Sequence, residues 1–438
     1  MSEHGTHSAP ELRSGAYLAL VGVSLVLGAV VAAVAAGYVW LYHEGIHLVW
    51  ETLPHELGVD PYTWWLVVAV PTLGGIAVGV VLVLIPGRGG PSPVAGHAIG
   101  GSTDPRIAPA ATIATLVSLV AGASLGPEAA LVTLASAIGG LVAMRLSLAD
   151  PPARVLAGAG TAGVLGAIFG TPLAGAMLML ELLTLSGTLL YAVLIPGLVA
   201  AVVGIEVFQE LLGEPFLSYQ LPPVGDLRAR DLGYAALIGV GGAIVGRLFM
   251  ATLRATHRRV DRHTLRRPIL LAAAGGLVVG LLGLGGDHLT LFSGESSLQT
   301  LIDDRSSLGL AALAYVLVAK LAATVVSMTT GFRGGQIFPV MFLGAAFGVL
   351  VAELTGDVPD GAAIACGMVA TTVAVMRVPI AAILIVTFFV GADVIPVVVI
   401  SAVAAYIVSF DLPLGPDHHE EAEVVTAEQD EPPSHPAG

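Results

Sequence analysis

Long apolar stretches joined by short polar connections make up most of this chain. Tyr17–Leu41 contains 25 residues without a charge and Trp64–Ile85 contains 22, and each can cross a bilayer core of about 30 Å. Further apolar segments lie near residues 107–122, 127–148, 154–169, 173–185, 189–212, 232–253, 268–284, 308–328, 338–354, 362–376, 380–391 and 394–409. Several are shorter than the roughly 18 residues that a full span needs. They predict helices that break inside the membrane, where protein or a watery cavity must satisfy the free backbone groups.

Two parts of the chain repeat one form. In each, a Gly-containing break and a proline lead into an apolar run, first at 124–142 (SLGPEAALVTLASAIGGLV) and then at 333–351 (RGGQIFPVMFLGAAFGVLV). A second proline-led run follows each, at 171–182 and 378–389. Pro127 and Pro339 are 212 residues apart, and Pro172 and Pro379 are 207 apart. Such matched, interrupted segments are typical of a transporter with its binding site between internal repeats.

These patterns predict an all-α, polytopic integral membrane protein with an internal repeat and many tilted and broken helices. The polar stretch at 213–230 is the predicted boundary between the halves. The predicted divisions are an N-terminal segment (1–15), a first membrane repeat (16–220), a second membrane repeat (221–410) and a disordered acidic tail (411–438).

Composition supports the membrane class. Hydrophobic residues make up 55% of the chain and charged residues 11%, which excludes a soluble domain of this length. The first apolar run is too long for the core of a signal peptide, and no small-residue cleavage site follows it, so we expect a retained helix. A single cysteine, Cys366, excludes an intrachain disulfide and a cysteine metal cluster. We predict neither a cofactor nor a metal.

The distribution of charge predicts an orientation. The net charge is −14, and the tail after Phe410 contributes much of it because it has no Lys or Arg. Six arginines lie between residues 254 and 267, and the positive-inside rule predicts that this segment is a cytoplasmic loop, with both termini also cytoplasmic. The acidic 42–63 connection lacks Lys and Arg and is predicted to lie outside. Because the basic cluster joins two membrane segments, we expect no nucleic-acid partner.

The two breaks predict an anion site. A helix that begins inside the membrane presents its first N–H groups and the positive end of its dipole, and a neighbouring glycine lets a ligand approach. The alternative interpretation is that both breaks are kinks that allow tight helix packing. The occurrence of two matched breaks favours the anion site over this alternative. The predicted anion contacts are Leu125, Gly126, Pro127, Glu128, Ala129, Gly335, Gln336, Ile337, Phe338 and Pro339.

These segments resemble the chloride channel (CLC) family. GFRGGQIFPVMFLGAAFG (331–348) is similar to that family's GGIFAP region, and FGTPLAGAMLMLE (169–181) to its FNAPLAGxxFxxE segment. SLGPEAALV (124–132) occupies the place of its GREGP filter, and GPSP (90–93) that of GSGIP. The resemblance covers roughly residues 64–410. It implies a homodimer with one anion pathway per subunit and two repeats of inverted topology.

Departures from the family pattern bear on mechanism. The gating glutamate of the family corresponds to Leu125, while Glu128 follows the proline. The proton-accepting glutamate of its antiporters corresponds to Leu182. Its tyrosine ligand falls near Gly415, and Ser92 is the hydroxyl available in place of its serine ligand.

Several single residues are candidates for a role in the pathway. Glu128 is expected either to complement the dipole of its own helix or to act as a protonatable plug. Glu181 is expected to be a hydrogen-bonded structural acid, with a proton-path role as the alternative. Lys320, with a carboxylate as its expected partner, and Arg333 are candidates for pathway electrostatics. Gln336 is a candidate side-chain donor at the site.

One motif favours a different class. His43-Glu44-Gly45-Ile46-His47 matches H-E-x-x-H, in which two histidines bind zinc and the glutamate acts as a base. A membrane metalloprotease is therefore the remote alternative, although no third ligand is identified and Gly45 weakens the helix.

The leading prediction is that the protein is not an enzyme but passes chloride or a similar small anion passively across a bacterial inner membrane. Absence of the usual internal glutamate favours uncoupled conduction, and proton-coupled antiport is the alternative. The identity of the anion stays open, since backbone donors recognise charge and size.

Overall fold

The computed structural model describes residues 15–86, 105–148, 152–183, 188–213, 216–217, 219–225, 227–286 and 288–411. Helices dominate this part of the chain, which contains no strand beyond one isolated two-residue bridge. The helices are α1 (Gly15–His47), the π-helix η1 (Leu48–Thr52), α2 (Leu53–Glu56), α3 (Trp64–Leu84), α4 (Ala108–Val120), α5 (Glu128–Arg145), α6 (Pro152–Phe169), α7 (Pro172–Leu183), α8 (Thr188–Leu212), α9 (Ala229–Arg266), α10 (Pro268–Gly283), α11 (Glu295–Asp303), α12 (Arg305–Thr329), α13 (Ile337–Thr355), α14 (Asp360–Met376), α15 (Pro379–Val390), the 3₁₀ turn η2 (Ala392–Val394) and α16 (Ile395–Ser409).

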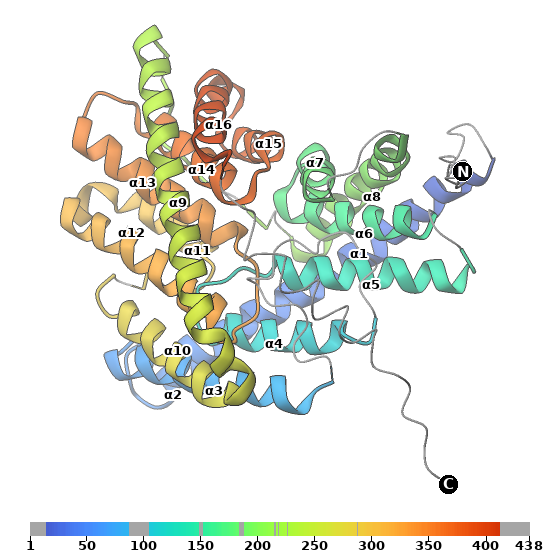
Figure 1. Ribbon diagram of the computed structural model, residues 1–438, viewed down its shortest axis with the longest axis horizontal. Helices are drawn as coiled ribbons and strands as arrows, with labels where there is room; N and C mark the ends of the chain where they lie inside the picture. The colour runs from blue at the N-terminus through green and yellow to red at the C-terminus, as the bar shows by residue number, and fades with distance from the viewer. Residues whose placement is uncertain are drawn as a thin grey trace, which may run out of the picture.

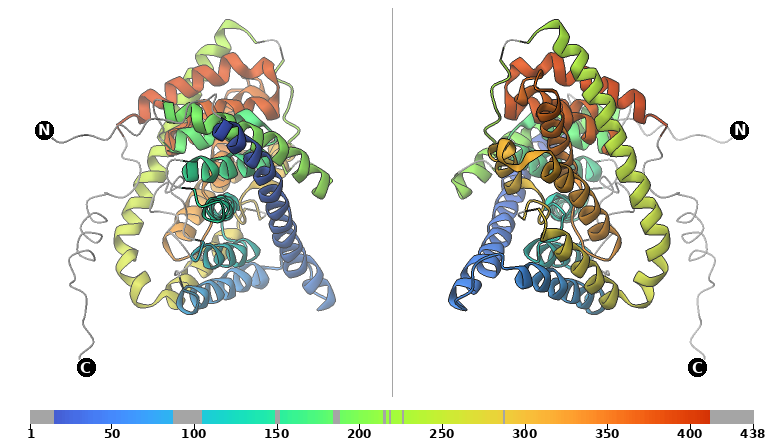
Figure 2. Two further views of the ribbon diagram at one scale, coloured as in Figure 1. Left: turned by 90° about the vertical axis from the view of Figure 1, so that its right-hand side faces the viewer. Right: turned by 90° about the vertical axis from the view of Figure 1, so that its left-hand side faces the viewer.

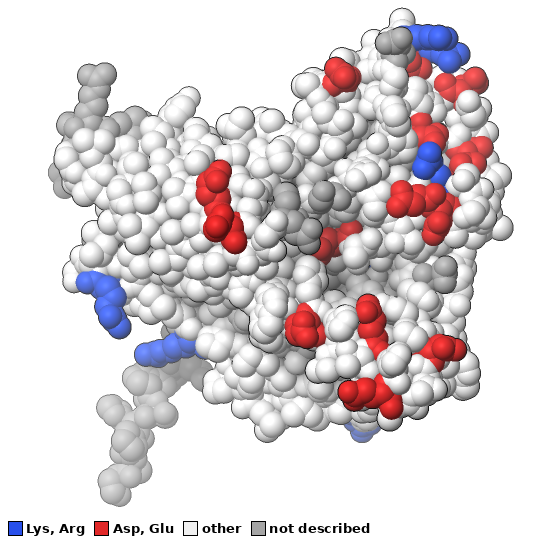
Figure 3. Space-filling view, turned by 180° about the vertical axis from the view of Figure 1, so that it is seen from behind, with Lys and Arg blue, Asp and Glu red and all other residues white. Residues whose placement is uncertain are grey.

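The predicted all-α polytopic class is confirmed. Within the described ranges, nine helices are long and apolar enough to cross a membrane, and five further apolar helices are shorter. The short ones include α7 and α15, as the sequence predicted. Wide areas of the surface carry no charge (Figure 3), as a surface that faces lipid requires.

The two halves pack in the same way. α5 packs on α6 as α13 packs on α14, α6 on α8 as α14 on α16, and α1 on α8 as α9 on α16. α5 and α13 lie on opposite sides of the centre of the molecule (Figure 1). The pairs α3–α10 and α7–α15 join the halves. The repeat that the sequence predicted is therefore a repeat of tertiary contacts.

Glycines permit equivalent close crossings in both halves. A Cβ on Gly139 of α5 would lie 2.8 Å from the carbonyl oxygen of Leu156 in α6, and a Cβ on Gly348 of α13 would collide with the carbonyl oxygen of Ala363 in α14. Such contacts let the backbones approach closely, which is how membrane helices gain packing energy without a hydrophobic driving force.

The predicted 254–267 loop is wrong, because this basic segment is the end of α9, which continues to Arg266. No Gly or Pro interrupts the sequence from Arg247 to Arg267, and the helix ends only where Pro268 excludes the helical conformation of the residue before it. α9 runs along one edge of the molecule, beside α16 (Figure 2). Its 38 residues span about 57 Å, so a charged end can extend beyond the apolar core of a membrane.

α11 was not predicted. Its residues, ESSLQTLID, are too few and too polar to register as an apolar segment. The helix buries Leu298, Leu301 and Ile302, which share one face at helical spacing. Residues 1–14 and 412–438 lie outside the described residues, so the predictions for the termini and for the tail beyond Asp411 stay predictions.

Candidate anion-binding site

The two glycine breaks meet at the centre of the fold. The N–H of Gly126 donates to the carbonyl of Gly335 at 2.8 Å, and the N–H of Gly335 donates to the carbonyl of Gly126 at 2.7 Å. The pairing is antiparallel, as two segments related by a two-fold axis require. The starts of α5 and α13 follow directly, so both helix N-termini lie at one place.

Two serines brace this junction in a reciprocal way. The N–H of Arg333 donates to Ser118 Oγ of α4 at 3.0 Å, and the N–H of Ser124 donates to Ser327 Oγ of α12 at 3.2 Å. Ser124 and Thr324 also share a hydrogen bond of 2.9 Å. Each serine therefore lies on the helix of one repeat and holds the break of the other.

Replacing Ser118 or Ser327 by alanine is expected to destabilise the protein by about 1–3 kcal/mol each, because a buried N–H then loses its acceptor. Both side chains are buried. Thr355→Ala is the matched control, since the exposed Thr355 hydroxyl bonds only within its own helix, and a change within about 0.5 kcal/mol is expected. Unfolding in detergent measures these effects. Equal stability of the serine variants and the control would refute the bracing role.

The Glu128 side chain connects the two repeats. It is the first residue of α5, but its Oε1 accepts the N–H of Ile337, the first residue of α13, at 2.6 Å. The side chain is 3% exposed, and Oε2 is buried without a hydrogen-bond partner among the described residues. The carboxylate thus occupies the N-terminus of α13, where its charge interacts favourably with the dipole of that helix.

Gly126 and Gly335 leave the space that this carboxylate fills. A Cβ on Gly126 would collide with Glu128 Oε2, and a Cβ on Gly335 would collide with Glu128 Cδ and Oε1. The glycines are therefore needed for the carboxylate as well as for the approach of the two backbones.

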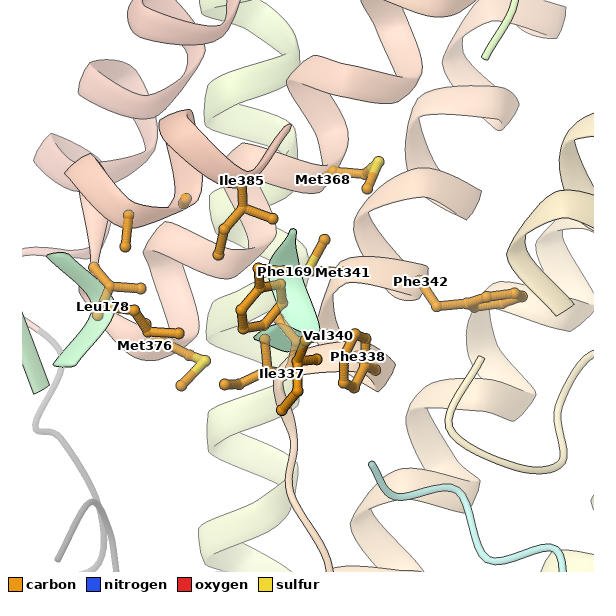
Figure 4. Packing of buried hydrophobic residues seen from close by; sticks show 14 of the residues in the cluster. Phe169, Leu178, Ile337, Phe338, Val340, Met341, Phe342, Met368, Met376 and Ile385 are labelled. Atoms are coloured by element: carbon orange, nitrogen blue, oxygen red, sulfur yellow. The ribbon is translucent and has the colours of Figure 1, made fainter. Parts of the chain in front are cut away.

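The structure brings together all the described residues of the predicted anion site. Pro127 and Gln336 are the N-cap residues of α5 and α13, and Ala129 lies in the first turn of α5. Leu125, Ile337, Phe338 and Pro339 are buried. Phe338 stacks on Phe169 with ring centres 5.6 Å apart (Figure 4). Gln336 Oε1 is buried without a hydrogen-bond partner among the described residues. Ser92 lies outside the described residues.

The predicted alignment of Pro127 with Pro339 is wrong by three residues. The reciprocal pair Gly126–Gly335 and the helix starts Glu128 and Ile337 are each 209 residues apart, so Pro127 corresponds to Gln336. Pro127 precedes its helix, whereas Pro339 is the third residue of α13, where a missing N–H costs nothing because the first turn has no intrahelical acceptor. A proline can therefore occupy different positions at two equivalent helix starts.

Lys320 has no carboxylate as its partner among the described residues, contrary to expectation. Its Nζ donates to the carbonyls of Leu291 and Phe292 at 2.8 and 2.9 Å and lies 4.8 Å from the centre of the Phe342 ring. Lys320 thereby holds the 288–294 segment against α12 and α13. Arg333 is placed at the site by the hydrogen bond of its backbone to Ser118. The roles of both in pathway electrostatics stay predictions.

Glu181 caps a second helix that starts inside the fold. Its carboxylate oxygens accept the N–H groups of Ile380 and Ala381 at 3.0 and 2.8 Å, which places it on the N-terminus of α15. These contacts fit the expected structural acid. A proton-path role stays a prediction.

The two histidines of the H-E-x-x-H motif face different partners. His43 Nε2 lies 3.6 Å from Glu295 Oε1, and His47 Nε2 lies 3.4 Å from Glu51 Oε2. Within the described ranges, no group of three or more His, Cys, Asp or Glu is arranged to hold a metal ion. The structure therefore gives the metalloprotease alternative no support.

Sequence reasoning missed Ser118, Ser327 and Glu295. The serines are 209 residues apart, so a comparison of the two halves at the correct spacing would have found them. Glu295 stands alone in a polar stretch and carries no local signal. Tyr42 of α1 donates its hydroxyl to Glu295 Oε2 at 2.7 Å, a contact that exists only in the tertiary structure.

Two helix N-termini that meet at one place inside a polytopic bundle are the arrangement from which membrane transporters with broken helices build anion sites. The sequence profile of the family described as voltage-gated chloride channel matches residues 92–410. The chain belongs to this family, as its motifs predicted.

Relatives and solved structures agree with this assignment. YfeO of Salmonella typhimurium, an ion-transport protein by name, is 32% identical over 333 residues, which cover 75% of this chain and 79% of YfeO. YfeO of Escherichia fergusonii is 32% identical over 337 residues, covering 75% and 78%. A slow cyanobacterial Cl⁻/H⁺ antiporter has the same fold, with a TM-score of 0.80 at 20% identity over 94% of this chain and 99% of the antiporter. A CLC-type fluoride/proton antiporter gives 0.77 at 24% identity, covering 91% and 98%.

Proposed function

We propose that this protein passes chloride or a similar small inorganic anion passively across the membrane, with Glu128 as the gate. One observation carries the proposal: a carboxylate, itself an anion, occupies the N-terminus of α13 through the Ile337 N–H. A permeating anion can use the same donors once that carboxylate leaves.

The donors at this site suit conduction. Backbone N–H groups and a helix dipole attract an anion without a full positive charge. Binding is then strong enough for entry and weak enough for release. Protonation of Glu128 removes its negative charge, and with it much of its advantage over a permeating anion. We therefore expect flux to rise as pH falls.

Uncoupled conduction is supported by the residues near Glu181. Leu182, which is buried, stands where the family resemblance places the proton-accepting glutamate of antiporters. Glu181 is engaged with α15 and has no adjacent acidic partner in sequence. Proton-coupled antiport is the second candidate, because two proteins of the same fold are named as proton antiporters.

We further propose a homodimer with one anion pathway in each subunit, located in a bacterial inner membrane. The family resemblance supports the dimer, and the bacterial relatives support the location. The basic end of α9 supports a cytoplasmic position for residues 254–267 and for both termini.

Flux from liposomes tests this function. Purified protein in chloride-loaded vesicles is expected to release chloride when valinomycin and potassium balance the charge, and an outwardly directed chloride gradient is expected to drive no proton uptake. Absence of flux from a folded, reconstituted protein would contradict anion permeation. Proton uptake in a fixed ratio to chloride would replace the channel with the antiporter.

A further inference from the structure

A pocket of about 510 Å³ lies beside the end of α1, η1 and the segment that leads into α11. We call it the aromatic pocket, because Tyr42, Tyr62 and Phe292 belong to its lining. None of the described residues that line it is Lys or Arg, whereas two are glutamates, Glu51 and Glu295. A cavity with carboxylates and without basic side chains attracts cations. Its occupant therefore differs in charge from the anion proposed above.

The backbone of the aromatic wall is held in an uncommon conformation. Tyr62, His288 and Phe292 have φ angles of 59°, 66° and 55°, in the left-handed region that favours glycine. All three line the pocket, and the described part of the chain has only two other such residues that are not glycine. Backbone strain of this kind persists where the surrounding contacts hold it, and it gathers at ligand sites.

Ring contacts provide that hold. His288 stacks on Tyr62 with ring centres 4.2 Å apart, and Trp50 stacks on Tyr62 at 5.4 Å. Trp50 also contacts Phe292 edge-on at 5.3 Å. Trp50 itself is fully buried and donates its Nε1–H to the carbonyl of Val120 at 2.8 Å. The wall is therefore a fixed set of aromatic rings, a surface that attracts ammonium groups and packs against alkyl chains.

Glu295 is a largely buried carboxylate without a basic partner. Its side chain is 11% exposed, and His43 Nε2 lies 3.6 Å from Oε1. Tyr42 donates its hydroxyl to Oε2 at 2.7 Å, and Ser293 Oγ accepts the Glu295 N–H at 3.1 Å. No Lys or Arg within the described ranges forms an ion pair with it. Because removal of a charge from water is costly, a cation bound in the pocket would stabilise this carboxylate.

The second carboxylate of the pocket lies beside the next turn of α1. Glu51 Oε2 is 3.4 Å from His47 Nε2, and the Glu51 side chain is 53% exposed. His43 and His47 are four residues apart, which is about 6 Å along a helix. Each imidazole therefore contacts one of two carboxylates, and the contacts are separated by about one helical turn. This spacing fits a ligand with two positive groups joined by a short apolar chain.

We propose that the aromatic pocket binds a small aliphatic diamine, with one ammonium group on Glu295 and the other near Glu51. An ammonium group donates three hydrogen bonds, and the Glu295 carboxylate and the hydroxyls of Ser293 and Ser296 line the pocket as acceptors. A metal ion is a poorer fit, because no group of three or more His, Cys, Asp or Glu in the described ranges is arranged to hold one. The binding does not depend on the function proposed above.

Calorimetric titration of the purified protein in detergent tests the proposal with two probes, putrescine and n-butylamine. Both have an ammonium group on a four-carbon chain, and only putrescine has a second one. The titration is made at about pH 8, where imidazole is ordinarily neutral and an alkyl ammonium group is charged. The wild type is expected to bind both amines, and putrescine about threefold more tightly, because the second contact is with the half-exposed Glu51.

Three variants locate the two contacts. Glu295→Gln should weaken both amines about thirtyfold, since the partly buried carboxylate makes the stronger charge pair. Glu51→Gln should weaken putrescine about threefold and leave n-butylamine unchanged. Glu44→Gln is the matched control, because Glu44 is exposed beside His43 but is not among the described residues that line the pocket. Its affinity for both amines should equal that of the wild type.

Each result decides the proposal. Equal affinities of Glu295→Gln and Glu44→Gln, both folded by size exclusion, would overturn it, and so would a folded wild type that binds neither amine. Saturable binding of Zn²⁺ in place of both amines would also overturn it. If Glu295→Gln does not fold, Glu51→Gln decides: selective loss of putrescine supports the diamine site, and equal loss of both amines contradicts it. Chloride flux tests the anion function separately.

Discussion

Replacing Glu128 by glutamine is expected to raise chloride flux at neutral pH about tenfold and to remove its pH dependence. Oε1 of Glu128 holds the Ile337 N–H at 2.6 Å, where an anion is proposed to bind. A hydrogen bond to a charged acceptor contributes about 1.5–3 kcal/mol, and 1.4 kcal/mol corresponds to a factor of ten. The neutral amide keeps the shape of the side chain but competes weakly, and it cannot take up a proton in this range.

Glu206→Gln is the matched control for this experiment. Glu206 is an exposed glutamate of α8 and, among the described residues, makes no hydrogen bond or ion pair with either helix start. The flux and pH profile of Glu206→Gln should therefore equal those of the wild type. A crystal of Glu128→Gln grown in bromide should show an anomalous peak at the N-terminus of α13. A Glu128→Gln protein that keeps the wild-type pH profile would remove this residue from the gate.

Gly335→Ala is expected to expel the Glu128 carboxylate from its position. A Cβ on Gly335 would overlap Cδ, Oε1 and Cγ of Glu128, while the backbone conformation of Gly335 is not left-handed and accepts an alanine. Overpacking of this kind costs about 1–3 kcal/mol. The variant should be less stable than the wild type, and its flux at neutral pH should be raised, as in Glu128→Gln.

A double-mutant cycle identifies the carboxylate as the cause. In a Glu128→Ala background the overlapping atoms are absent, so adding Gly335→Ala should cost less than about 0.5 kcal/mol. Gly233→Ala is the control, since a Cβ there meets nothing within 4 Å. Unfolding in detergent gives the free energies. An equal cost of Gly335→Ala in both backgrounds would show that the backbone, and not Glu128, requires this glycine.

Much of the fold could be predicted because its signals are local. In lipid, each spanning segment must form its backbone hydrogen bonds internally and expose apolar side chains. Membrane helices such as α3 or α13 can therefore be recognised in the sequence as apolar runs. The starts of α7 and α15 at Pro172 and Pro379 were likewise marked by prolines. The end of α9 was not predicted, because its cluster of arginines was interpreted as a loop. Arginine is compatible with a helix.

The candidate site was predicted as a set of residues but not as an arrangement. The doubled Gly/Pro break indicated two helix starts, and their chemistry indicated an anion. No local pattern shows that the Glu128 carboxylate of the first repeat accepts a hydrogen bond from the first turn of α13 in the second repeat. That contact depends on the antiparallel pairing of Gly126 with Gly335. The same holds for Lys320, whose expected partner was a carboxylate and whose actual acceptors are two backbone carbonyls.

By itself the sequence determined the class of this protein: an all-helical, duplicated membrane protein of the chloride channel family with two broken-helix starts. Composition, apolar segment length and the Pro/Gly pattern suffice for this, because the bilayer constrains each segment separately. Only the tertiary structure decided which atoms meet. It places Glu128 on α13, Glu181 on α15 and Glu295 beside Tyr42, since each contact joins residues far apart in the chain through the packing of two repeats about one centre.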